Sequence, residues 1–228
     1  MGKILLLSEL FLLLILLTVS PGSSSEGPDK TPVLTFVQRM ESAFRALENY
    51  TCEVEQTYYK DGVEDRRYLF KSYFMKEKNI RIDFFQPFPS LTIFYRNGEQ
   101  EATVTPFRSL PALQFRFSMD NPMIKTPTGQ KINQTDMGHF IQFVFKNLQR
   151  VDQGKEEYDE GRDQVRFLFW ALDYIDEKYP EKYWIILSQK SWFPIRIERY
   201  SLQGKPIEVS EIKNYTINTR LPKNFFLP

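Results

Sequence analysis

Apolar residues recur every three or four positions in two segments of this chain, and each segment predicts an amphipathic helix. In residues 35–49 the apolar positions are Phe36, Met40, Phe44 and Leu47. In residues 136–148 the stripe is broader and consists of Met137, Phe140, Ile141, Val144, Phe145 and Leu148. Thr135 and Asp136 precede the second stripe, and side chains of this kind cap helix N-termini.

The rest of the chain predicts short strands, because runs rich in aromatic and branched residues alternate with turn signals. Asp61-Gly62 and Asn97-Gly98 supply the positive φ angles of tight hairpins. The expected strands are 52–59, 67–75, 79–85, 91–95, 102–106, 113–118, 150–152, 164–170, 183–188, 194–200 and 207–217.

The predicted fold class is mainly β with α. Consecutive hairpins favour an antiparallel sheet of about ten strands, and a sheet of that size usually curls. We therefore expect an incompletely closed antiparallel β-barrel with an N-terminal helix and a mid-chain helix as lid or plug. The pattern leaves two alternatives open: the helices complete an ordinary core, or they cover a cavity.

The first 25 residues, with an approximate boundary, have the pattern of a secretory signal peptide. Lys3 is followed by an apolar run at 10–17 and by small residues at 20–25. Ser8-Glu9 interrupts the apolar stretch, which is too short to span a bilayer easily. An uncleaved membrane anchor is the alternative. Residues 26–228 are expected to form a single domain in the periplasm, soluble after signal cleavage.

Composition narrows the function classes. The chain has 20 Phe and 12 Tyr but one His and one Cys, which disfavours catalytic triads and Cys/His metal clusters. Its net charge of +1 argues against a nucleic-acid partner. We predict no enzyme, no metal and no cofactor. An enzyme is the third option, with the carboxylate pairs Glu53/Glu55 and Asp173/Asp176 and the acidic cluster 156–160 as its possible acid/base groups. We interpret these carboxylates as surface groups, and His139 as a helix-surface group or a satisfied buried imidazole.

Several segments resemble the LolA-like outer-membrane lipoprotein carriers and the wider LolA-LppX-RseB superfamily. Residues 79–87 form an aromatic-rich strand end closed by Pro87, and the hairpin at Asn97-Gly98 leads to Pro106-Phe107. Residues 192–204 are similar to a late hairpin opened by a proline and ended by a glycine. Residues 218–228 are similar to a closing strand with Leu-Pro and Phe.

The resemblance implies an unclosed barrel that holds acyl chains in an apolar cavity, in the periplasm, without cofactor or metal. It also implies a basic residue that helps to close the lid, and Lys76 or Arg81 could take this place. The local pattern Met75-Lys76-Glu77-Lys78 departs from the family's Arg-Pro. The segment 106–130 also departs and could form extra lid or rim.

The leading hypothesis is a periplasmic carrier or chaperone for lipoprotein transport in outer-membrane biogenesis, with an inner-membrane exporter and an outer-membrane acceptor as further partners. The alternative is an RseB-like sensor that binds an acylated or unfolded partner. We expect transient membrane contact, for which Trp192-Phe193 is the candidate. The expected ligand-binding residues are Phe70, Phe74, Ile82, Phe84, Ile93, Phe115, Phe117, Phe140, Ile141, Val144, Phe145, Phe167 and Phe169.

Overall fold

The computed structural model describes residues 32–150, 157–172 and 179–228, so the predicted signal peptide lies outside the described residues. The helices in these ranges are α2 (Pro32–Ala46), α3 (Met137–Arg150) and the short 3-10 helices η1 (Pro122–Ile124) and η2 (Ile132–Gln134). The strands are β1 (Asn49–Lys60), β2 (Val63–Met75), β3 (Asn79–Gln86), β4 (Thr92–Tyr95), β5 (Glu101–Thr105), β6 (Phe115–Ser118), β7 (Tyr158–Glu160), β8 (Gln164–Leu172), β9 (Pro180–Ser188), β10 (Pro194–Tyr200) and β11 (Pro206–Ile217).

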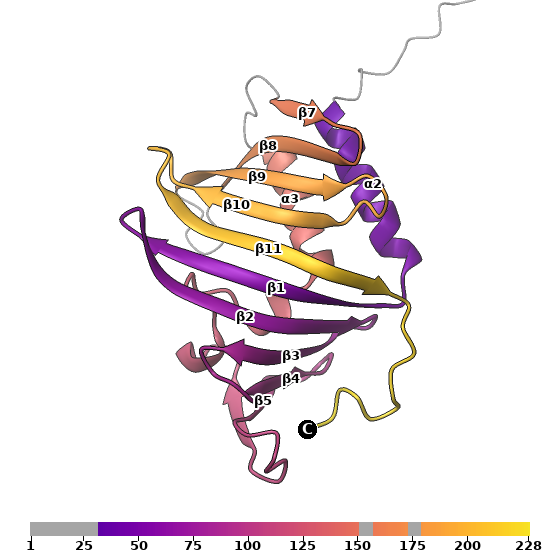
Figure 1. Ribbon diagram of the computed structural model, residues 1–228, viewed down its shortest axis with the longest axis vertical. Coiled ribbons are helices and arrows are strands. Elements are labelled where there is room, and N and C mark those ends of the chain that lie inside the picture. The colour runs from indigo at the N-terminus through magenta and orange to yellow at the C-terminus, as the bar shows by residue number, and fades with distance from the viewer. Residues whose placement is uncertain (1–31, 151–156, 173–178) are drawn as a thin grey trace, which may run out of the picture. The chain divides into compact units, whose positions relative to one another are not determined.

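The strands form one eleven-stranded antiparallel sheet in the order β6-β5-β4-β3-β2-β1-β11-β10-β9-β8-β7. It consists of two meanders, β1 to β6 and β7 to β11, which are joined because the first strand pairs with the last (Figure 1). Val54 at this junction lies opposite Ile212 on β11 and Phe70 on β2. The predicted unclosed, curled antiparallel sheet with an N-terminal and a mid-chain helix is confirmed.

This topology explains the position of the second helix. β6 and β7 are the two edges of the sheet, so the chain between them must cross from one edge to the other. The crossing segment carries η1, η2 and α3, and α3 packs beside α2 and against β8. Both helices therefore cover the same face of the sheet (Figure 1).

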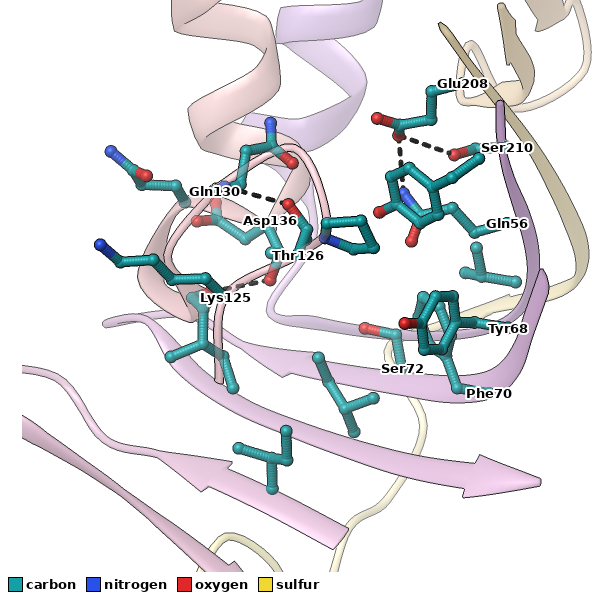
Figure 2. A pocket seen from close by; sticks show the side chains of 18 of the residues that line it. Gln56, Tyr68, Phe70, Ser72, Lys125, Thr126, Gln130, Asp136, Glu208 and Ser210 are labelled. Atoms are coloured by element: carbon teal, nitrogen blue, oxygen red, sulfur yellow. Dashed lines mark hydrogen bonds between the residues drawn. The ribbon is translucent and has the colours of Figure 1, made fainter. Parts of the chain in front are cut away.

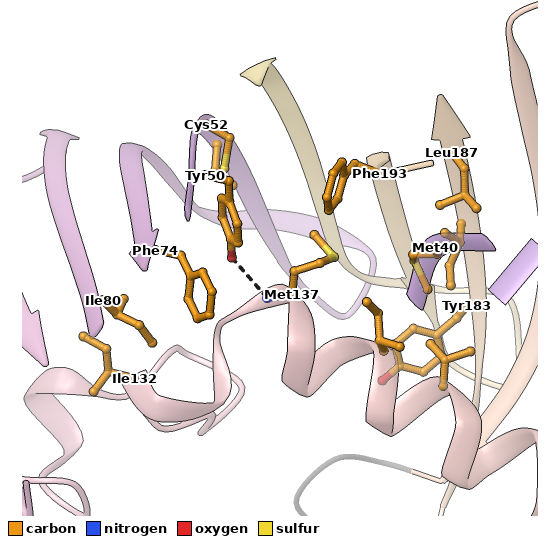
Figure 3. Packing of buried hydrophobic residues seen from close by; sticks show 14 of the residues in the cluster. Met40, Tyr50, Cys52, Phe74, Ile80, Ile132, Met137, Tyr183, Leu187 and Phe193 are labelled. Carbon is orange, nitrogen blue, oxygen red and sulfur yellow. Dashed lines mark hydrogen bonds between the residues drawn. The ribbon is translucent and has the colours of Figure 1, made fainter. Parts of the chain in front are cut away.

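The hydrophobic core lies between the helices and this face. α2 contributes Val33, Phe36, Val37 and Met40, all buried, and α3 contributes Met137, Ile141 and Val144. The facing strand residues include Phe167, Phe169, Ile185 and Leu187, each fully buried. Figure 3 shows Met40 and Leu187 at one end of this cluster, with Phe74 and Ile80 toward the other. Because the apolar stripes of both helices are used here, the helices are part of the core.

The local signals read from the sequence are confirmed at several positions. Asp136 accepts a hydrogen bond from the backbone N–H of His139 at 3.0 Å and so caps α3. Gly62 and Gly98 have φ angles of +86° and +80°, as their hairpin turns require. The predicted strand at 150–152 is wrong at Arg150, which ends α3, and its other two residues lie outside the described part of the chain. None of the described helices has both the length and the apolar character needed to cross a bilayer.

Candidate functional site

A cavity of about 720 Å³ lies between the helix-covered face of the sheet and the crossing segment. This volume falls within the roughly 300–1,000 Å³ of small-molecule ligand pockets. One wall is formed by strands and the other by residues 122–137, which we call the cover. Figure 2 shows Lys125, Thr126 and Gln130 of the cover on the opposite side of this space from Tyr68 and Phe70.

Strand alternation decides which side chains reach the cavity. On β1 the even-numbered positions point inward, and on β2 the same rule holds. The inward residues of β1 that line the cavity are Tyr50, Cys52, Val54, Gln56 and Tyr58. Those of β2 are Arg66, Tyr68, Phe70 and Ser72.

The cover is short of regular structure and is held by polar contacts. The Asn121 side chain accepts from the N–H of Met123 at 2.9 Å and starts η1. The Thr126 hydroxyl accepts from the N–H of Gln130 at 3.0 Å, which closes the loop between η1 and η2. At its end, the N–H of Met137 donates to the Tyr50 hydroxyl at 3.1 Å and joins the cover to β1. The cover is thus fixed at its two ends and looped between them.

The larger part of the cavity wall is apolar. Phe70 and Phe84 lie on neighbouring strands with ring centroids 5.5 Å apart, and Ile82 and Ile93 continue this surface onto β3 and β4. The cover contributes Ile124 and Ile132, and the start of α3 contributes Phe140. A wall of this kind can bury a hydrocarbon chain, and the free energy gained is about 0.8 kcal/mol per methylene group.

The rest of the wall carries buried polar groups on β1, β10 and β11. Gln56 donates to Oε1 of Glu208 at 2.7 Å (Figure 2). Arg199 donates to both carboxylate oxygens of Glu181, at 2.5 and 3.1 Å, and lies 3.7 Å from Glu208. Burial acts to lower the pKa of Arg199, but Tyr183, Glu181 and Glu208 raise it by more, so Arg199 stays charged.

Cys52 lies in the cavity wall and is the one cysteine of the chain. Burial, with a smaller contribution from Glu53, raises the pKa of its thiol to about 12 from 9.0. At pH 8 the folded protein should therefore hold on the order of a thousandfold less thiolate than the unfolded chain, and only the thiolate reacts. We expect Ellman's reagent to label the native protein slowly and the guanidinium-unfolded protein rapidly. Equal rates would contradict a buried thiol.

Five of the expected ligand-binding residues line the cavity: Phe70, Ile82, Phe84, Ile93 and Phe140. The others lie elsewhere for one main reason. The helices fill most of the inner face formed by β8 and β9, so the cavity lies mainly in front of β1 to β4, β10 and β11, with Tyr183 of β9 also in its wall. Residues outside the cavity wall are Phe74, Phe115, Phe117, Ile141, Val144, Phe145, Phe167 and Phe169.

The reasons differ in detail. Ile141, Val144, Phe167 and Phe169 are buried in the core between α3 and the sheet, and Phe145 packs at its margin. Phe74 stacks on Tyr50 with ring centroids 5.0 Å apart. Phe115 lies on the edge strand β6 and is largely exposed, and Phe117 on the same strand packs on the core margin.

The two basic residues expected at the lid do not lie near the cover. Lys76 donates from Nζ to the carbonyl of Arg45 at 2.9 Å, at the end of α2. Arg81 lies on the outer face of β3, because it alternates with the inward Ile80 and Ile82. There it pairs with Asp83 at 3.0 Å and lies 4.5 Å from the Phe225 ring, so it holds the C-terminal segment. These contacts give no support to lid closure through Lys76 or Arg81, which stays a prediction.

Trp192-Phe193 was expected as an exposed contact, and the structure contradicts this. Phe193 is fully buried and stacks on Tyr215 at 4.6 Å. Trp192 packs against the core, and the guanidinium of Arg39 lies 4.7 Å from its ring. Both side chains therefore serve to join the β9–β10 turn to the rest of the fold.

The acidic residues considered for catalysis are placed as follows. Glu55 forms ion pairs with Arg67 and Lys213, both at 3.3 Å, and Glu53 accepts from Asn214 at 2.8 Å. These contacts lie on the solvent-facing side of β1, away from the cavity. In the acidic cluster 156–160, residues 157–160 are exposed around β7, while residue 156 and the pair Asp173/Asp176 lie outside the described residues.

His139 lies in the first turn of α3 and is half-buried. Burial, with a contribution from Lys78, lowers the pKa of its imidazole, while Asp136 acts in the opposite direction. Among the described residues, no three His, Cys, Asp or Glu side chains are grouped so that they could hold a metal ion.

Sequence reasoning did not find several cavity residues. The cover contributes Met123, Ile124 and Ile132, whose segment has two prolines and no periodic pattern that would have placed them. Phe143 also lines the cavity, although it lies off the centre of the apolar stripe of α3. The polar wall residues Arg199 and Glu208 lie on strands that carry charged residues on both faces. Only the register of β10 and β11 shows that these two side chains face the cavity.

No family model matches this chain, and no curated protein does. Solved structures are similar to it at low identity. An uncharacterized conserved protein from Thermus thermophilus has a TM-score of 0.51 and 10% identity, with 87% of this chain and 94% of that chain covered. A LolA superfamily protein from Nitrosomonas europaea has a TM-score of 0.40 and 12% identity, with 87% and 99% covered.

A third similar structure is the complex of MucA and MucB from Pseudomonas aeruginosa, with a TM-score of 0.48, 11% identity and 85% of this chain covered. This chain spans 60% of that one. At these identities a likeness establishes the fold alone. The chain therefore has the fold of the Thermus protein, an unclosed antiparallel sheet with helices on one face.

Proposed function

We propose that this chain is a periplasmic carrier that binds the acyl chains of a lipoprotein or lipid in its cavity and moves them between membranes. The observation that carries the proposal is the cavity of about 720 Å³ with Phe70, Ile82, Phe84 and Ile93 in its wall. Ten buried methylene groups contribute roughly 8 kcal/mol of gross binding free energy, which is enough to extract an acyl chain transiently.

A carrier must also reach a membrane, and exposed apolar residues at one end of the sheet support this. Phe107 and Leu110, in the β5–β6 connection, are 51% and 57% exposed. Phe88 and Met123 are 53% and 77% exposed, and both also line the cavity. Arg108 joins the β5–β6 connection to the end of β3, since it donates to the carbonyl of Phe84 at 3.3 Å. We call these four apolar residues the apolar rim.

The charge around the apolar rim favours a lipid surface as its partner. Residues 84–91 and 106–118 contain Arg108 and Arg116 and no Asp or Glu. Apolar side chains flanked by arginines bind interfaces of anionic lipid through buried area and electrostatic attraction together. Because Phe88 and Met123 belong to both the rim and the cavity, an acyl chain can pass from the membrane into the cavity here.

The experiment is transfer of a pyrene-labelled phospholipid between donor and acceptor vesicles that contain anionic lipid. We expect the transfer rate to rise in proportion to protein concentration. The double variant Phe107→Ser/Leu110→Ser should lower this rate about tenfold or more, because it removes two exposed apolar side chains that would enter the lipid surface and leaves the cavity unchanged.

Ile217→Ser is the matched control for the rim. Ile217 is 49% exposed, but it ends β11 beside the start of β1, at the opposite end of the sheet. This variant should transfer lipid at the parent rate. A protein that binds the labelled lipid and never transfers it would contradict the carrier and favour a sensor of acylated partners.

A further inference from the structure

A connected group of polar side chains extends across four neighbouring strands at the cavity wall. Arg199 on β10, Glu208 on β11 and Gln56 and Tyr58 on β1 line the cavity, and Glu181 on β9 pairs with Arg199 outside the lining. Charged and polar groups in an apolar wall are costly unless they are fully paired. A wall that only held hydrocarbon would be more stable with apolar side chains at these positions.

Two atoms of this group are incompletely satisfied. Tyr58 is 3% exposed, and its hydroxyl has no hydrogen bond of good geometry among the described residues, although the Thr126 side chain lies near enough to act against the rise in its pKa. Glu208 accepts from Gln56 at 2.7 Å through Oε1, whereas its Oε2 has long contacts, 3.4 Å from the Thr128 hydroxyl and 3.7 Å from Arg199. Burial and the adjacent Glu208 raise the pKa of Tyr58 well above its ordinary value, so its hydroxyl remains a donor.

The cover over these atoms is loosely attached. Residues 126–130 form a loop closed by the contact of Thr126 with the N–H of Gln130. This loop reaches the wall through the 3.4 Å contact of Thr128 with Glu208 and through the proximity of Thr126 to Tyr58. A ligand hydroxyl that displaced Thr128 would accept from Tyr58 and donate to Oε2 of Glu208. One hydroxyl group can do both, because it is a donor and an acceptor.

The charge of the group selects against anions. Two carboxylates, Glu181 and Glu208, surround the single guanidinium of Arg199. Of the other cations of the wall, Arg66 lies 3.2 Å from Asp65, and Lys125 lies 3.3 Å from Asp120, a carboxylate that Lys131 also contacts at 2.8 Å. A buried carboxylate or phosphate of a ligand would therefore meet excess negative charge.

We propose that Tyr58 and Glu208 bind a hydroxyl group of an amphiphile whose polar head is uncharged, while its acyl chain lies on the apolar wall. The inference rests on the proposed function and names its ligand class. Aromatic rings connect the polar group to the apolar wall. The ring centroid of Tyr68 lies 5.8 Å from that of Tyr58 and 6.3 Å from that of Phe84. The head and the chain of one molecule can thus contact both regions at once.

The test compares three probes with the same acyl chain, monoolein, methyl oleate and oleate, by tryptophan fluorescence or calorimetric titration. The parent protein should bind monoolein about tenfold more tightly than methyl oleate, since the diol alone can satisfy Tyr58 and Glu208. Oleate, an anion, should bind no more tightly than methyl oleate. Glu208→Gln removes one negative charge, so it should narrow the difference in affinity between monoolein and oleate.

Tyr58→Phe is the decisive variant. It should lower the affinity for monoolein to that for methyl oleate and leave the melting temperature of the empty protein unchanged or higher, because it removes an unsatisfied buried hydroxyl. Tyr59→Phe removes the same group from the next residue, which does not line the cavity, and should bind like the parent.

The outcomes separate the two proposals. If all three probes bind equally, if oleate binds best, or if Tyr58→Phe keeps the preference for monoolein, the hydroxyl site is overturned and the carrier stands. If none of the probes binds, the proposed function fails, and this site fails with it.

Discussion

The Ser72→Trp substitution is expected to lower the affinity for a fluorescent acyl probe on the order of a hundredfold. Ser72 lies on β2 with its side chain in the cavity wall, between Cys52 on β1 and Ile82 on β3 (Figure 2). An indole at this position occupies space that the acyl chain needs. If it keeps about four methylene groups out of the cavity, binding weakens by about 3 kcal/mol.

The fold should tolerate this change, because the added side chain enters a cavity and does not overpack the core. Ser42→Trp is the matched control: Ser42 lies on α2, away from the cavity wall, so the same substitution there leaves the cavity as it is. Parent-like affinity in the Ser72 variant, with an unchanged melting curve, would mean that the acyl chain binds elsewhere.

Val144→Asp should destabilise the protein by about 4 kcal/mol or more, because it places an unpaired charge in the core. Val144 is fully buried on α3, in the cluster that includes Phe167, Phe169 and Ile185. A helix acting as a movable lid would tolerate the charge by opening. Urea denaturation of the variant therefore distinguishes a core helix from a lid.

Two further positions on the same helix complete this comparison. Gln142→Asp lies on the exposed side of α3 and should change the free energy of unfolding by less than about 0.5 kcal/mol. Phe140 lies in the cavity wall, so Phe140→Asp should lower the affinity for an acyl probe strongly and the free energy of unfolding less. A Val144 variant as stable as the Gln142 variant would contradict our assignment of α3 to the core.

The elements and their order could be predicted from local pattern, because a 3.6-residue period and strand alternation are properties of short segments. Hairpin signals such as Asn97-Gly98 gave the antiparallel connections, and Asp136 marked the start of α3. The pairing of β1 with β11 joins residues far apart in sequence, so it could not be predicted from a local pattern.

The cavity residues were harder to predict for a related reason. Phe70 and Phe167 both lie in apolar strands, yet one lines the cavity and the other is core. The difference arises from where α3 crosses the sheet, which depends on the edge positions of β6 and β7. Arg199 and Glu198 are likewise adjacent and charged, and only the register of β10 shows that Arg199 is the one facing the cavity.

Native mass spectrometry of the protein purified from its own host tests most directly whether the cavity carries acyl chains. We predict that the parent protein carries bound lipid with at least one acyl chain, and that the Ser72→Trp variant from the same host lacks it. A parent protein free of lipid, or equal lipid on both proteins, would contradict the account.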